Sequence, residues 1–146
     1  MREFRLHDTQ DTLDLGERIG RAATGGSVIA LRGGLGAGKT TLAKGVALGL
    51  GIDEEVTSPT YTIVSEYEGR LRLHHIDAYR LSGAEEFLAL GGDELLSDSG
   101  GICLVEWSER IESALPPESS VLELRIEADE SRTAVLAGAG LEGALA

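Results

Sequence analysis

The chain has 146 residues, which is enough for one domain with a single core but too few for a large motor ATPase or a synthetase. Lysine and arginine number 13 against 25 aspartates and glutamates, and the resulting charge of −12 disfavours direct binding to nucleic acid, whose backbone attracts cations. A single cysteine, Cys103, excludes an internal disulfide, and no apolar run is long enough to cross a membrane, so we expect a cytoplasmic protein.

The first third of the chain predicts two strands that alternate with two helices. Arg2 to Leu6 is typical of a short strand, and Asp8 or Thr9 can cap the helix that follows. Ser27 to Arg32 is an apolar run of strand length whose weak alternation indicates burial on both faces. A glycine-rich turn leads from it into a helix from about Lys39 to Leu50.

The middle of the chain predicts a hairpin and then a helix. Residues 61–67 and 71–77 are rich in strand formers, and a Glu-Gly-Arg turn between them favours antiparallel pairing. The alternation in LRLHHID suggests that this second strand is less buried than the later apolar run ICLVE. Ser82 and Glu85 fit a capping box for a helix that runs to about Leu90.

The last third predicts a buried strand, a short helix and a second hairpin. Ile102 to Val105 is the apolar strand, and Ser108 to Leu115 is a short helix that two prolines terminate. Val121 to Glu127 alternates cleanly, and Thr133 to Ala137 can return beside it. The glycine- and alanine-rich tail, residues 138–146, offers little to pack, so we expect it to be frayed.

These elements predict one α/β domain over residues 1–137, with three layers and a mixed sheet. The sheet should be parallel at its centre, with antiparallel hairpins toward its edges. No internal repeat or linker divides the chain.

The strongest motif is GGLGAGKT, Gly33 to Thr40, which matches G-x-x-x-x-G-K-[ST] between a predicted strand and a predicted helix. This context indicates a P-loop NTPase fold, in which glycines let backbone N–H groups surround a polyphosphate at a helix N-terminus. Lys39 would then contact the β and γ phosphates, Thr40 would bind Mg²⁺ and Thr41 could reach the α phosphate. The residues expected to bind ATP here are Gly34, Leu35, Gly36, Ala37, Gly38, Lys39, Thr40 and Thr41.

A magnesium-nucleotide site of this kind needs a carboxylate at the end of a nearby strand. Glu106 ends the apolar run ICLVE and is the favoured acid, either as a magnesium ligand or as a residue that orients water. Asp77 ends LRLHHID and is expected to support it. Either carboxylate could instead be a solvated residue at a strand end.

Four further side chains could reach the nucleotide. Thr60 and Thr62 in SPTYT follow the P-loop helix, where a segment can respond to the γ phosphate, but the same residues also suit an ordinary proline-containing turn. Arg80 and Arg132 could contact phosphate or base, or could simply be solvated.

The remaining candidates favour structural roles. His74 and His75 are adjacent and therefore face opposite sides of a strand, so they cannot bind one metal together. Cys103 lies in an apolar strand without basic neighbours and is expected to be an inert thiol. Trp107 could be a core residue or part of a partner surface.

The succession of GGLGAGKTT, SPTYT, IDAYR and CLVEW resembles the bacterial TsaE family, formerly called YjeE, over nearly the whole chain to about residue 135. Members of that family are small ATPases required to make threonylcarbamoyladenosine in transfer RNA. The resemblance implies partners: TsaD, which transfers the threonylcarbamoyl group, and TsaB, with ATP hydrolysis keeping their complex cycling. A charge of −12 suits binding to a protein complex better than binding to transfer RNA itself.

The resemblance also implies functional residues at matching positions. It assigns Lys39, Thr40 and Thr41 to phosphate and magnesium, Asp77 and Glu106 to the functional acids, and Trp107 to their neighbour. Contacts on the adenine side would fall at Thr9 to Asp11 and near Ser131 and Arg132.

Two other functions remain open. A small-molecule or nucleotide kinase usually needs an arginine-bearing lid, and the stretch from Ser82 to Gly101 is short, acidic and free of arginine. A nucleotide-gated binding module, in which hydrolysis is incidental, is compatible with every motif. A regulatory GTPase is disfavoured, because the chain has no asparagine for the asparagine-lysine-x-aspartate motif.

Overall fold

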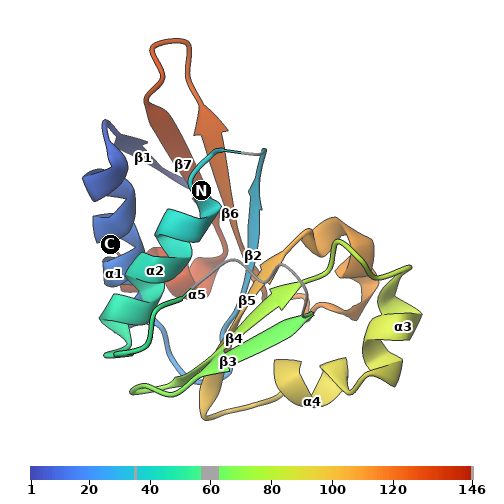
Figure 1. Ribbon diagram of the computed structural model, residues 1–146. Helices are drawn as coiled ribbons and strands as arrows, with labels where there is room; N and C mark the ends of the chain where they lie inside the picture. The colour runs from blue at the N-terminus through green and yellow to red at the C-terminus, as the bar shows by residue number, and fades with distance from the viewer. Residues whose placement is uncertain (35, 57–62, 146) are drawn as a thin grey trace.

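The computed structural model describes residues 1–34, 36–56 and 63–145, which form a seven-stranded mixed sheet between two layers of helices (Figure 1). The strands are β1 (Arg2–Leu6), β2 (Val28–Gly33), β3 (Val64–Tyr67), β4 (Arg72–Asp77), β5 (Gly101–Glu106), β6 (Ser120–Ile126) and β7 (Arg132–Ala137). The helices are α1 (Thr9–Ala22), α2 (Lys39–Gly49), α3 (Ala84–Ala89), α4 (Gly92–Leu96), the 3-10 helix η1 (Ser108–Ala114) and α5 (Ala139–Ala144). No helix within the described residues is long and apolar enough to cross a membrane.

The sheet has the strand order β1-β7-β6-β2-β5-β4-β3. The four central strands, from β6 to β4, run parallel, while β3 pairs antiparallel with β4, and β7 pairs antiparallel with both β6 and β1. The predicted mixed sheet with a parallel centre and antiparallel edge hairpins is therefore confirmed. Because the central strands are parallel, the carboxyl ends of β2, β4 and β5 meet at one edge of the sheet.

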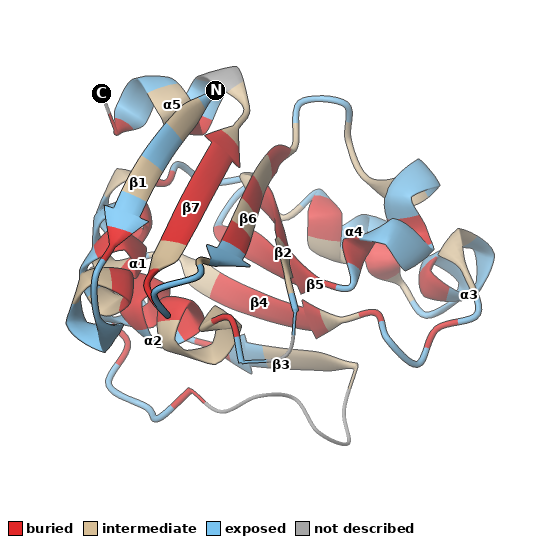
Figure 2. Ribbon diagram, turned by 90° about the horizontal axis from the view of Figure 1, so that it is seen from above, coloured by how far each residue is buried: buried red, intermediate tan, exposed pale blue. Residues whose placement is uncertain are grey.

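Each face of the sheet has its own core. On one face, α1, α2 and α5 cover residues such as Leu31 and Leu104, and on the other, α3, α4 and η1 cover residues such as Val105. Figure 2 shows that buried residues concentrate on the central strands and on the helix faces turned toward them. Strand β4 is buried from Leu73 to Ile76 but only partly buried at its two ends, whereas β5 is buried throughout, so the predicted lower burial of β4 is confirmed.

Helices α1 and α2 approach each other through paired glycines. Gly16 and Gly20 of α1 face Gly45 and Gly49 of α2, and a Cβ added to Gly45 would lie only 2.3 Å from the carbonyl oxygen of Leu13. Only glycine, whose side chain is a single hydrogen atom, permits two helix backbones to come this close. This contact sets the position of α2, whose first turn carries the predicted phosphate-binding residues.

One local prediction about α3 is wrong. Helix α3 begins after Gly83 with no side-chain cap, and the Ser82 hydroxyl instead donates to the Glu86 carboxylate over 3.1 Å, so the capping box with Glu85 does not form. Helix α3 ends at Ala89, close to its predicted end near Leu90, and the short helix α4 that begins at Gly92 was not among the predicted elements. Gly91 separates the two helices, and its φ of +88° lies in the left-handed region that favours glycine at a helix end.

The tail also differs from the prediction that it is frayed. Residues 139–144 form α5, and both Leu141 and Leu145 are buried against the core that α1 and α2 share. The guanidinium of Arg18 donates to the carbonyl oxygen of Leu145 over 3.2 Å. Leucines four residues apart lie on one side of a helix, and this pair supplies the apolar contact that the composition of the tail obscures.

Candidate functional site

The glycine-rich turn connects the carboxyl end of β2 to the start of α2, as the motif predicts. Gly36 and Gly38 have φ values of +80° and +105°, in the left-handed region that favours glycine. The amide of Ala37 donates to the carbonyl oxygen of Gly34 over 3.1 Å and closes the bend. Gly38 provides no side-chain cap for α2, so the first-turn amides, which lack intrahelical acceptors, can hold an anion.

Lys39 and Glu106 face each other beside this turn. The Nζ atom of Lys39 lies 3.8 Å from Oε1 of Glu106, and both side chains are largely buried. The other carboxylate oxygen, Oε2, lies 2.6 Å from Nε2 of His75, which is fully buried. Burial raises the pKa of Glu106, but the hydrogen bond and charge of His75, together with Lys39, outweigh it and hold this pKa below its ordinary value. The site therefore contains an ionised carboxylate at neutral pH.

Asp77 is the register neighbour of Glu106, because the two residues end the parallel strands β4 and β5 side by side. Its Oδ1 atom accepts a hydrogen bond from the amide of Tyr79 over 3.0 Å, and the residue is half-buried. The structure thus brings together the two acids that the sequence singled out. Glu106 is the one in contact with Lys39, and Asp77 is the more exposed one.

Trp107 lies at the rim of this site. Its backbone is left-handed, with φ +58°, and its side chain is partly exposed, so it is not a core residue. The Nζ atom of Lys39 lies 5.0 Å from the centre of the Trp107 ring, within the range of a cation–π contact. Tyr79 packs on the same tryptophan with ring centres 5.0 Å apart, and Arg110 lies over Tyr79.

A hollow of about 220 Å³ opens on the other side of the glycine-rich turn. Thr9, at the start of α1, and Arg132, at the start of β7, both line it although they are far apart in the sequence. Nη2 of Arg132 donates to the carbonyl oxygen of Gly36 over 3.0 Å. The remaining residues that line the hollow are Leu6, His7, Asp8, Thr12, Gly36, Ala37, Gly38, Thr41 and Glu130.

The other predicted site residues fall into two groups. Thr40 and Thr41 are described, and both belong to the first turn of α2. Leu35, Thr60 and Thr62 lie outside the described residues, so their predicted roles stay predictions.

Sequence reasoning missed several residues of this site. The sequence favours a structural role for His75, yet this residue contacts Glu106, and the sequence assigns Tyr79 no role beyond its place in IDAYR, yet it packs on Trp107. His75 lies two residues before Asp77 on the same strand, so strand alternation places both on one face, and this signal could have identified it. Asp8 and Glu130 reach the hollow through tertiary folding alone.

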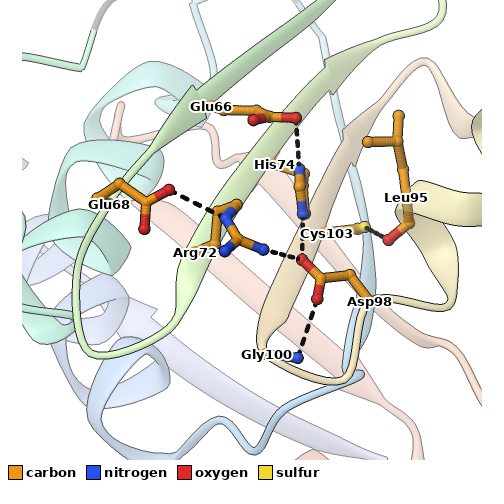
Figure 3. A network of polar contacts seen from close by, with 8 residues as sticks. All are labelled: Glu66, Glu68, Arg72, His74, Leu95, Asp98, Gly100 and Cys103. Atoms are coloured by element: carbon orange, nitrogen blue, oxygen red, sulfur yellow. Dashed lines mark hydrogen bonds and ion pairs between the residues drawn. The ribbon is translucent and has the colours of Figure 1, made fainter.

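His74 points to the opposite face, as predicted, and belongs to a separate polar network (Figure 3). Its Nε2 atom lies 2.7 Å from Oδ2 of Asp98, and Arg72 donates to the same oxygen over 2.7 Å. His74, the amide of Gly100 and Arg72 together lower the pKa of Asp98 to about 2. Cys103 is adjacent, and burial raises the pKa of its thiol to about 12, consistent with an inert side chain.

Comparisons with known proteins agree on one family. A model of the family "Threonylcarbamoyl adenosine biosynthesis protein TsaE" matches residues 6–134. The tRNA threonylcarbamoyladenosine biosynthesis protein TsaE of Treponema pallidum is 47% identical over 128 residues, covering 88% of this chain and 94% of that protein. The protein of the same name from Bacillus subtilis is 40% identical over 139 residues, covering 94% and 86%.

A solved structure is similar to nearly the whole chain. The crystal structure of Bacillus subtilis YdiB matches 99% of this chain and 93% of its own, with a TM-score of 0.78 and 33% sequence identity. The family match covers the glycine-rich turn, both strand-end acids and the hollow beside α1. This chain therefore belongs to the TsaE family of threonylcarbamoyladenosine biosynthesis proteins.

Proposed function

We propose that this protein is a magnesium-dependent ATPase with a P-loop NTPase fold that supports synthesis of N6-threonylcarbamoyladenosine in transfer RNA. In this proposal it binds the complex of TsaD and TsaB and uses ATP hydrolysis to keep that complex cycling. The observation that carries the proposal is the pairing of Lys39 with an ionised Glu106 beside a glycine-rich turn, in a chain of the TsaE family.

The proposed nucleotide site uses both sides of the glycine-rich turn. The turn and the start of α2 bind the phosphates, with Lys39 supplying positive charge and Thr41 reaching the α phosphate. Thr9 and Arg132 bind the nucleoside side, a role that their position in the adjoining hollow supports. Arg132 also supports the turn through its hydrogen bond to Gly36.

The residues present suit a magnesium ion. Mg²⁺ prefers oxygen ligands, and the lowered pKa of Glu106 keeps this carboxylate charged at neutral pH. Thr40 and Glu106 would hold the ion, directly or through water, with Asp77 in support. Bound Mg²⁺ would neutralise negative charge that develops on the β and γ phosphates. Glu106 could also orient the attacking water, since Lys39 lies beside it and can keep the γ phosphate close.

The surface next to the site suits a protein partner. Trp107 and Tyr79 are both partly exposed, and aromatic residues are common anchors at protein interfaces. The net charge of −12 also favours a protein complex over transfer RNA. We therefore expect slow ATP turnover by this protein alone and faster turnover when TsaD and TsaB contribute to the site.

The direct test is to titrate fluorescent ATP into the purified protein with and without TsaD and TsaB, and to measure phosphate release. We expect saturable, magnesium-dependent binding, co-elution with the complex that depends on nucleotide, and turnover that the partners increase. Absence of saturable binding at millimolar ATP would refute the nucleotide site. Equal turnover with and without partners would refute the proposed cycling, and phosphate transfer to a small acceptor would indicate a kinase.

A further inference from the structure

We propose that His75 is a positioning residue for Glu106, which it holds by a hydrogen bond from Nε2 to Oε2. This inference rests on the proposed function, because it concerns the same carboxylate. The distance from Nε2 to Oε2 is 2.6 Å, which is within the range of a strong hydrogen bond to an ionised acceptor. His75 is fully buried, so it acts on the nucleotide and its metal ion only through Glu106.

The surroundings of the imidazole ring decide which nitrogen carries the proton. Within the described residues, Nδ1 of His75 is buried and has no hydrogen-bond partner. A proton on Nδ1 alone would leave a buried N–H without an acceptor and place the Nε2 lone pair against a carboxylate, which is doubly unfavourable. Nε2 therefore carries a proton whether the ring is neutral or charged, and it donates to Glu106.

This bond assigns different partners to the two oxygens of Glu106. Oε2 is held by His75, whereas Oε1 faces Nζ of Lys39 at 3.8 Å, which is longer than a direct hydrogen bond. Without the donor on His75, the largely buried carboxylate would have Lys39 as its nearest charged partner and would turn toward it. His75 thus keeps Oε1 of Glu106 available to a metal ion or water, and leaves Lys39 available to phosphate.

The position of His75 in the sheet explains why it can hold the carboxylate of Glu106. His75 is the register partner of Leu104, two residues before Glu106 on the adjacent parallel strand. Alternation puts His75 and Asp77 on the same face of β4, and this face is the one that α2 covers. A donor fixed in the centre of a sheet has little freedom to move, which is what the orientation of a metal-binding carboxylate requires.

The test compares two substitutions that differ in their ability to donate. His75→Gln keeps an N–H group near the position of Nε2, while His75→Met keeps the bulk and removes the donor. The primary readout is the Mg²⁺ concentration at which fluorescent ATP binding reaches half of its magnesium-dependent gain. We expect His75→Met to need about ten times more Mg²⁺, as is typical for loss of a residue that orients a metal ligand, and His75→Gln to stay within about threefold of the wild type.

A second readout needs no nucleotide or metal. NMR of the resting protein with isotope-labelled histidine reports which ring nitrogen carries the proton, and we expect Nε2 of His75. Glu106→Gln should shift that signal. The matched control is His74→Met, one residue away on the opposite face, which should lower stability without changing the Mg²⁺ requirement.

Three results would overturn the inference: a wild-type Mg²⁺ requirement in His75→Met, an Nδ1-protonated ring, or no response of the ring to Glu106→Gln. If His75→Met does not fold, His75→Asn replaces it, because its amide is one carbon too short to reach Glu106. An Asn variant equal to His75→Gln would then count against the inference. Failure of the wild type to bind ATP would refute the proposed function instead, and the NMR measurement would still decide the hydrogen bond.

Discussion

The close approach of α1 and α2 predicts that Gly45→Ala destabilises the protein. The added methyl group would lie 2.3 Å from the carbonyl oxygen of Leu13 and 2.9 Å from Cα of Gly16, where ordinary contacts begin at 3.4 Å. The helices must therefore separate by about 1 Å to restore normal contact. Overpacking of this kind costs about 1–3 kcal/mol, and the upper part of that range, about 2–3 kcal/mol, applies here because the clash is with backbone atoms. The higher helix propensity of alanine offsets about 1 kcal/mol of it.

We expect a net loss of about 1–2 kcal/mol, which lowers the melting temperature by about 2–8 °C in a domain of this size, at about 2–4 °C per kcal/mol. Thermal unfolding followed by circular dichroism, together with urea titration, measures both quantities. The control is Gly143→Ala in α5, where an added Cβ meets nothing within 4 Å, so the variant should be as stable as the wild type or slightly more so. A Gly45→Ala variant as stable as the wild type would show that the two helices tolerate a wider separation and would refute the reasoning.

Three further substitutions test the site and the separate network on the other face of the sheet. Lys39→Ala should weaken ATP binding by about 10–100-fold in calorimetry, since it removes a charged contact to phosphate; near wild-type affinity would contradict its role. At saturating Mg²⁺, Glu106→Ala should bind ATP within about threefold of the wild type but hydrolyse it at least about tenfold more slowly, and normal turnover would transfer the role to Asp77. Asp98→Asn tests whether protonation of Asp98 is coupled to stability. The pKa of Asp98 falls from 3.8 to about 2 on folding, so the stabilisation that its charged form provides is present above about pH 4 and is lost as the pH falls toward 2. The difference in unfolding free energy between wild type and Asp98→Asn should therefore shrink over that range, and a constant difference would contradict the contribution of the His74 and Arg72 contacts.

Local signals in the sequence predicted most of the elements. The strand from Arg2 to Leu6 was placed at the bounds that the structure shows, and Asp8 caps α1 by accepting from the amide of Asp11 over 2.9 Å, as one of the two predicted caps. The glycine-rich turn is recognisable from sequence because the P-loop motif that it matches has particular residues at fixed spacing. The position of Glu106 at the end of a strand also identified it, because the end of an apolar run can be recognised in the sequence without knowing which strands pair with it.

Predictions failed where a distant contact outweighs local preference. The tail was expected to fray because its composition is poor in apolar residues, yet the core beneath α1 and α2 buries Leu141 and Leu145. The capping box at Ser82 was plausible by spacing, but Gly83 is the residue that precedes α3. In both cases the competing local conformations differ little in free energy, so tertiary packing decides which one forms.

The sequence alone determined the order and type of the main elements, the glycine-rich turn between β2 and α2 and the two candidate acids, because periodicity, capping and motif spacing depend on near neighbours. Only the tertiary structure decided that Glu106 contacts His75 and Lys39, that Arg132 reaches Gly36, and that α2 packs on α1 through glycines. These contacts join residues separated by about thirty to about a hundred positions, and they depend on strand order and register, which no local pattern specifies.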